Sequence, residues 1–86
     1  TAGELLDEVG NSFLRTVKVY ERLIKDKAIS PEEYREWVEF VPKFQAMWDH
    51  AYQLWTASGE SKELRALILR LQEELLVFVL KRRGEP

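Results

Sequence analysis

Few side chains in this sequence have the type and spacing that catalysis or metal binding requires. Glu32, Glu36 and Glu39 would share one face of a helix, and paired carboxylates act as general acid and base when burial separates their pKa values. These three fall on a polar helix face, where solvated ion pairs are the usual state. His50 is the only histidine and has no Glu or His one helical turn away, which a metal site would need. The sequence therefore predicts no catalytic site, no metal site and no cofactor, and a protein that is not an enzyme.

Basic side chains form two groups that could contact nucleic acid. One group would lie on the first helix and the other would close the last: Arg15, Lys18 and Arg22, and Lys81, Arg82 and Arg83. Together they would make a phosphate-binding patch at one pole of a helical bundle. The helix dipole explains the same placement, since acids open all three predicted helices and bases close the first and third. With a net charge of −2, we favour the dipole interpretation and keep nucleic-acid binding as the alternative.

Residues 31–56 hold seven of the ten aromatic residues, including all three tryptophans. Apolar side chains recur there in steps of three and four residues, the spacing of one helix face: Tyr34, Trp37, Val41, Phe44, Trp48, Ala51 and Trp55. Such a row can line a ligand pocket, but it is more often core, and we expect most of it to be core. The apolar arc is wider than one neighbouring helix needs. We therefore expect one edge, formed by Phe40, Met47 and Leu54, to be exposed or used in assembly.

Three predicted helices would position these residues: 3–25, 31–57 and 62–83. Ser30, Pro31 and Glu33 have the types expected of an N-cap, a first helical residue and the closing residue of a capping box. Gly59 is suited to end the second helix and Ser61 to cap the third. Both connections are short, which predicts antiparallel neighbours. The fold class is therefore all-α, an antiparallel three-helix bundle in a single domain.

Two residues interrupt the helical pattern. Gly10 lies inside the first predicted helix, where glycine costs about 1 kcal/mol relative to alanine, and its small size lets a neighbouring helix approach closely. Pro42 lies inside the second, where it removes a backbone donor and clashes with the preceding turn. The apolar phase continues through Pro42, which falls on the polar face. We therefore expect one helix kinked at Pro42, whereas a break there would give a four-helix bundle.

The third predicted helix carries two apolar stripes. The main stripe is wide enough for a bundle core and consists of Leu64, Leu67, Ile68, Leu71, Leu75, Phe78 and Val79. Leu69, Leu76 and Leu80 form a second stripe, centred about 120–140° away around the helix. A monomeric bundle needs only the first stripe, so the second is a candidate surface for an oligomer or a partner.

Composition limits the class of protein further. The chain has 86 residues, 45% of them hydrophobic and 33% charged, which is typical of one globular domain over residues 1–86. There is no cysteine, which suits a cytoplasmic protein, and no apolar run of membrane-spanning length. Few thermolabile residues among many Glu, Lys and Arg suggest a thermophilic source. We expect a non-enzymatic interaction module that self-associates; the alternative is a nucleic-acid-associated helical protein.

Overall fold

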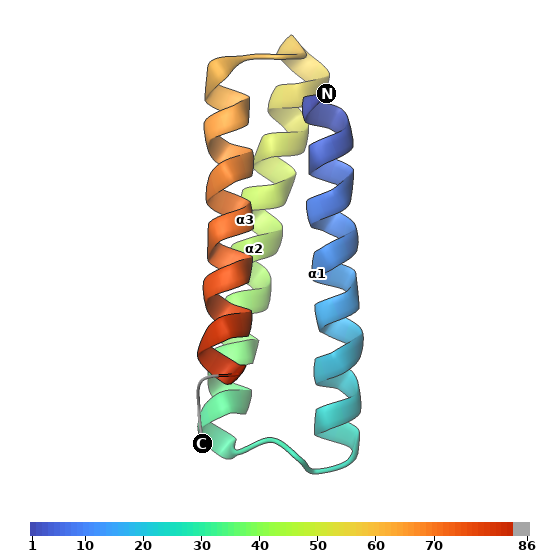
Figure 1. Cartoon of the computed structure of the whole chain (residues 1–86), viewed down its shortest axis with the longest axis vertical. Helices are drawn as coiled ribbons and strands as arrows, with labels where there is room; N and C mark the ends of the chain where they lie inside the picture. The colour runs from blue at the N-terminus through green and yellow to red at the C-terminus, as the bar shows by residue number, and fades with distance from the viewer. Residues whose placement is uncertain (84–86) are drawn as a thin grey trace.

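Three helices make up the part of the chain that the structure describes. The computed structural model describes residues 1–83, with side chains for residues 1–81. The helices are α1, Ala2–Lys25, α2, Pro31–Ser58, and α3, Lys62–Arg83. All three pack against one another in a bundle of 43 × 21 × 18 Å, and α2 runs antiparallel to both α1 and α3 (Figure 1). The predicted all-α, antiparallel three-helix bundle is confirmed.

Two serines and a glycine set the helix ends where the sequence predicts them. Ser30 Oγ accepts a hydrogen bond from the Glu33 N–H at 3.1 Å, and Ser61 Oγ accepts one from the Leu64 N–H at 3.0 Å. Gly59 has a φ of 68°, in the left-handed region that glycine adopts without a steric clash. Each serine satisfies a backbone donor that the start of a helix leaves unpaired, so both turns can be short.

The start of α1 is held by one local contact, of a type that a Thr-x-x-Glu pattern indicates, and by one long-range contact that no sequence pattern indicates. Thr1 and Glu4 form a reciprocal capping box. Glu60, in the α2–α3 connection, accepts a hydrogen bond from the Ala2 N–H at 2.6 Å and forms an ion pair with Arg65 at 2.9 Å. The Ala2 N–H first, and the Arg65 guanidinium after it, hold the pKa of the Glu60 carboxyl below its usual value. One carboxylate therefore ties the α2–α3 connection to the first turn of α1.

Aromatic rings from all three helices stack in the core. The closest ring centroids are 4.1–4.4 Å apart, and they join Tyr20 to Trp37, Phe40 to Phe78 and Phe13 to Phe44. Toward the α2–α3 connection the core becomes aliphatic, with Leu6, Leu64, Ile68 and Leu71 almost fully buried. No polar or charged side chain is buried among the described residues. The core is therefore held by apolar burial and ring packing.

Two glycines of α1 receive two tryptophans of α2. A Cβ added at Gly10 would lie 3.2 Å from Trp48 Nε1, and one added at Gly3 would lie 2.8 Å from Trp55 Cζ2. The glycines are seven residues apart, as are the tryptophans, so one antiparallel register makes both contacts. The prediction that Gly10 permits a close approach is confirmed, and Gly3 does the same one heptad earlier.

Pro42 lies inside one uninterrupted helix. α2 continues on both sides of it, from Pro31 to Ser58, so the four-helix alternative is wrong. Pro42 is exposed, and the carbonyl whose hydrogen bond it removes belongs to Val38, which is also exposed. The unpaired carbonyl thus belongs to a solvent-exposed residue, where a lost hydrogen bond costs less than it would in the core.

Candidate functional site

The leucine stripe of α3, defined as Leu69, Leu76 and Leu80, is exposed in the bundle. The three side chains expose 59%, 57% and 52% of their surface, while the main apolar stripe of α3 turns inward to the core. Leu76 also lines the groove between α1 and α3, so the middle of the stripe borders that groove. The sequence thus located an apolar row that the bundle does not cover, and its role as an interface stays a prediction.

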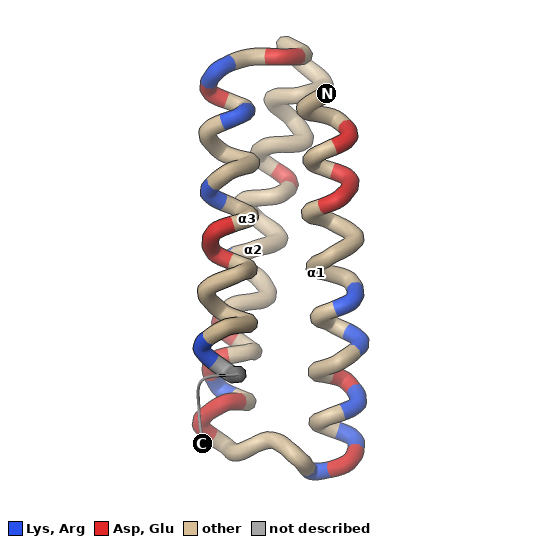
Figure 2. Tube along the Cα trace, viewed as in Figure 1, with Lys and Arg blue, Asp and Glu red and all other residues tan. Residues whose placement is uncertain are grey.

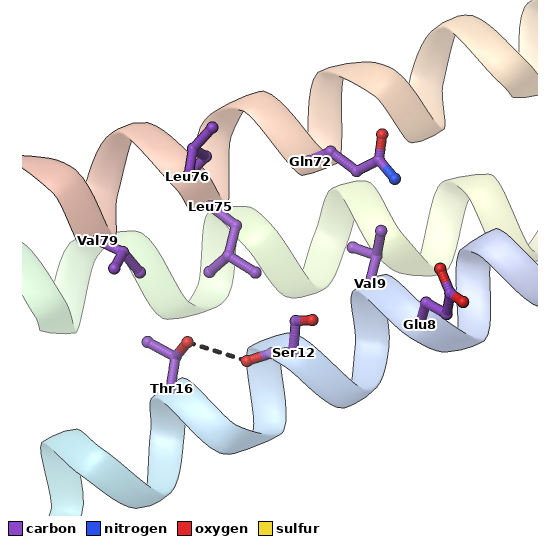
Figure 3. Close-up of a pocket in the computed structure, with 8 residues that line it drawn as sticks. All are labelled: Glu8, Val9, Ser12, Thr16, Gln72, Leu75, Leu76 and Val79. Atoms are coloured by element: carbon purple, nitrogen blue, oxygen red, sulfur yellow. Dashed lines mark hydrogen bonds between the residues drawn. The ribbon is translucent and has the colours of Figure 1, made fainter.

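A groove of about 420 Å³ runs between α1 and α3 beside the leucine stripe (Figure 3). Leu75 and Val79 face it from α3, and Ser12 and Thr16 face it from α1. Thr16 Oγ1 donates to the carbonyl oxygen of Ser12 at 2.9 Å, so this hydroxyl is satisfied within α1. Ser12 and Thr16 are short side chains, and the groove lies open above them. The groove and the stripe form one largely apolar surface.

The edge of α2 that the sequence placed outside is half-buried in the bundle. Phe40, Met47 and Leu54 are half-buried and pack against the core, and the Phe40 ring stacks on Phe78 at 4.2 Å. The expectation that this edge is exposed is therefore wrong, although its use in an interface remains untested.

The opposite edge of α2 carries the exposed apolar side chains Tyr34, Val38 and Tyr52. Tyr34 belongs to the row expected in the core, but it is displaced by about 60° around the helix from the buried Trp37. Tyr52 stacks on Trp48 at 5.3 Å. At the Tyr52 end of this edge, Gly3 and Gly10 of α1 lie against the neighbouring Trp55 and Trp48 and have no side chains that could cover Tyr52. Periodicity alone gave no signal for this difference, because both edges flank the same buried row.

A second groove, of about 300 Å³, lies between α1 and α2. Phe13, Phe44 and Trp48 line it together with Asp7 and Asp49. The Trp48 indole N–H is already engaged, donating to the carbonyl oxygen of Leu6 at 3.0 Å. Trp37 is buried and Trp55 is half-buried against the core, so most of the tryptophan row serves packing rather than a ligand pocket.

The predicted basic residues whose side chains the structure describes do not gather on one surface. Arg15, Lys18 and Arg22 are exposed on α1, where Lys18 and Arg22 share a shallow depression with Glu21. Lys81 points to α2 and pairs with Glu36 at 3.3 Å. The side chains of Arg82 and Arg83 lie outside the described residues. Figure 2 shows that the second half of α1 is mainly basic, and Glu21 lies among its basic residues. The nucleic-acid interpretation stays a prediction that this arrangement does not strengthen.

The remaining candidates for chemistry lie on the surface. Glu32 and Glu39 are exposed, and Glu36 is partly buried in its ion pair with Lys81. His50 is exposed. Within residues 1–83, no group of three or more His, Asp or Glu side chains could hold a metal ion. These side chains form no arrangement in which one could activate another.

The chain has no significant match among protein-family models, curated proteins or solved structures. None of the described helices is both long enough and apolar enough to cross a bilayer. A function must therefore be argued from the surfaces of the bundle itself.

Proposed function

We propose that this protein is a non-enzymatic helical interaction module that self-associates through the leucine stripe of α3. The observation that carries the proposal is the exposure of Leu69, Leu76 and Leu80 in one row, each by more than half of its surface. Contiguous apolar surface of this kind marks sites of association. The absence of any buried polar or charged side chain among the described residues supports a binding role, since catalytic groups are commonly tuned by burial.

The size of the interface follows from the free energy of association. Burying a half-exposed leucine is worth about 1 kcal/mol, so six leucines in a homodimer would contribute about 6 kcal/mol. Association costs about 4–15 kcal/mol in lost translational and rotational freedom. The stripe alone would give at best weak association, and a stable dimer must also bury the α1–α3 groove beside it. As part of the same proposal, we place the module in the cytoplasm, on the strength of a sequence without cysteine.

Light scattering over a concentration series tests the proposal directly. The wild-type chain should approach twice its monomer mass of 10.2 kDa, and Leu76→Glu should remain monomeric with unchanged helicity by circular dichroism. Leu14→Glu is the matched control, because Leu14 is exposed to 56%, nearly the same as Leu76, but lies in the α1–α2 groove. A wild-type monomer at every concentration, or equal effects of the two substitutions, would refute the proposal.

A further inference from the structure

The exposed rim of the α1–α3 groove carries two opposite charges one heptad apart. Glu8 lines the groove, and Arg15 Nη2 donates to Oγ of Ser12, another lining residue, at 3.0 Å. Residues seven apart lie on nearly the same side of a helix. In the described part of the chain neither Glu8 nor Arg15 has an ion-pair partner within 4.0 Å. The rim of α1 therefore offers one unpaired acid and one unpaired base, both beside the groove.

The same segregation of charge extends along the whole of α1. Acidic residues occupy its first part and mainly basic residues its second part, as Figure 2 shows. The acids are Glu4, Asp7 and Glu8, and the bases are Arg15, Lys18, Arg22 and Lys25. An α1 helix laid antiparallel to a second α1 would place acids opposite bases at both ends. Charge complementarity of this kind selects an orientation more strongly than it adds affinity.

The leucine stripe is centred at the same level of the bundle as the charge pair. The midpoint between Glu8 and Arg15 falls at residues 11–12 of α1, and the midpoint between Leu69 and Leu80 falls at residues 74–75 of α3. Ser12 and Leu75 line the same groove and lie across it from each other in Figure 3. A two-fold axis that passes through this level perpendicular to the helices would therefore bring Glu8 to the partner's Arg15. The same axis would bring Leu69 to the partner's Leu80.

From these positions we infer that two copies of the chain pair groove to groove in an antiparallel dimer, α1 against α1 and α3 against α3. This inference rests on the proposed self-association and specifies its geometry. A two-fold axis parallel to the bundle would instead lay α1 against the α3 of the other copy, since α1 and α3 run in the same direction (Figure 1). Glu8 would then face Leu69 and the like-charged Glu73 of the second copy. The antiparallel arrangement avoids this repulsion. It also forms the ion pair between Glu8 and the partner's Arg15 twice, once on each side of the two-fold axis.

Charge-reversal variants test the antiparallel arrangement by sedimentation equilibrium at low salt. Glu8→Arg or Arg15→Glu places two like-charge contacts in the dimer, and each should weaken dimerisation about tenfold. A one-to-one mixture of the two single variants should recover the wild-type affinity as a heterodimer, and so should the double variant alone. The differences in dimer affinity between the variants and the wild type should shrink in 1 M salt, where the Debye length is about 3 Å. Glu21→Arg, on the other flank of α1, changes the net charge by the same amount as Glu8→Arg and should leave the affinity within twofold.

The outcomes separate this inference from the proposed function. If the wild-type chain is monomeric throughout, self-association itself fails. If the wild-type chain dimerises and Leu76→Glu disrupts it, self-association stands. In that case, single reversals without effect, or reversals that mixing does not rescue, overturn the antiparallel arrangement alone. Circular dichroism of each variant shows that the fold is retained.

Discussion

The indole nitrogen of Trp48, on α2, donates a hydrogen bond to the main-chain oxygen of Leu6, on α1, at 3.0 Å. In an α-helix this oxygen also accepts the N–H of the residue four positions later, which is Gly10. The indole reaches the backbone because Gly10 has no side chain there, a Cβ at that position lying only 3.2 Å from Nε1. Glycine, which disfavours the helix by itself, thus permits a polar contact between two helices.

Gly10→Ala should therefore destabilise the protein despite its higher helix propensity. Alanine gains about 1 kcal/mol in an exposed helix, but crowding costs about 1–3 kcal/mol and the indole hydrogen bond, worth about 1 kcal/mol, is weakened. We expect a net loss of about 1 kcal/mol in urea unfolding. Asn11→Ala, at the adjacent exposed position, should be slightly stabilising. A Gly10→Ala variant that is more stable than wild type would show that Trp48 can move aside freely.

The two prolines of α2 should respond oppositely to alanine. Pro42→Ala restores a helical hydrogen bond to the Val38 carbonyl and should stabilise the protein by about 1–3 kcal/mol. Pro31 occupies the first turn, where its missing N–H has no helical partner, so Pro31→Ala should be neutral or slightly destabilising. Thermal unfolding of the two variants gives the comparison. If both variants shifted the thermal unfolding midpoint equally, Pro42 would not destabilise α2 as we expect.

The Glu60 carboxylate should make stability depend on pH in the acid range. The Ala2 N–H, and after it Arg65, lower the pKa of Glu60 in the folded state. The stabilisation is therefore present above the unfolded-state pKa, about 4.3, and is lost as pH falls through the folded-state pKa. Glu60→Gln should be less stable than wild type at pH 7, and the difference should narrow below about pH 4. A difference independent of pH would mean that the charge of Glu60 contributes nothing.

Glu73 interrupts the leucine stripe between Leu69 and Leu76. Its replacement by leucine therefore tests whether apolar burial along this stripe drives dimerisation. Glu73→Leu extends the row toward the partner's Leu76 and should tighten dimerisation at least tenfold, because two more leucines are buried in each dimer. Glu74→Leu is the control, since it adds the same side chain at an exposed position about 100° away around the helix. Equal tightening by both would indicate nonspecific hydrophobic association.

Local features were predictable from the sequence, and arrangements between helices were not. Ser30, Ser61 and Gly59 act on their own backbone neighbours, so residue type and position suffice to assign them. The leucine stripe was also predictable, since helical periodicity separates it from the core stripe of α3. By contrast, a three-helix bundle can turn left-handed or right-handed, and the two forms place α3 on opposite edges of α2. The apolar periodicity of the sequence is compatible with both forms. For that reason the covering of Phe40 by Phe78 could not be predicted, nor could the contact of Lys81 with Glu36.

The placement of the three tryptophans gives the protein a built-in optical probe of one interface. Each indole belongs to α2 and meets α1 at a different level: Trp37 stacks on Tyr20 at 4.1 Å, while Trp48 and Trp55 lie against Gly10 and Gly3. Intrinsic emission should therefore report separation of α1 from α2 along its whole length. The leucine stripe contains no tryptophan, so pairing of two bundles through α3 should leave the emission spectrum nearly unchanged. Unfolding and assembly of this chain can thus be followed independently in the same cuvette.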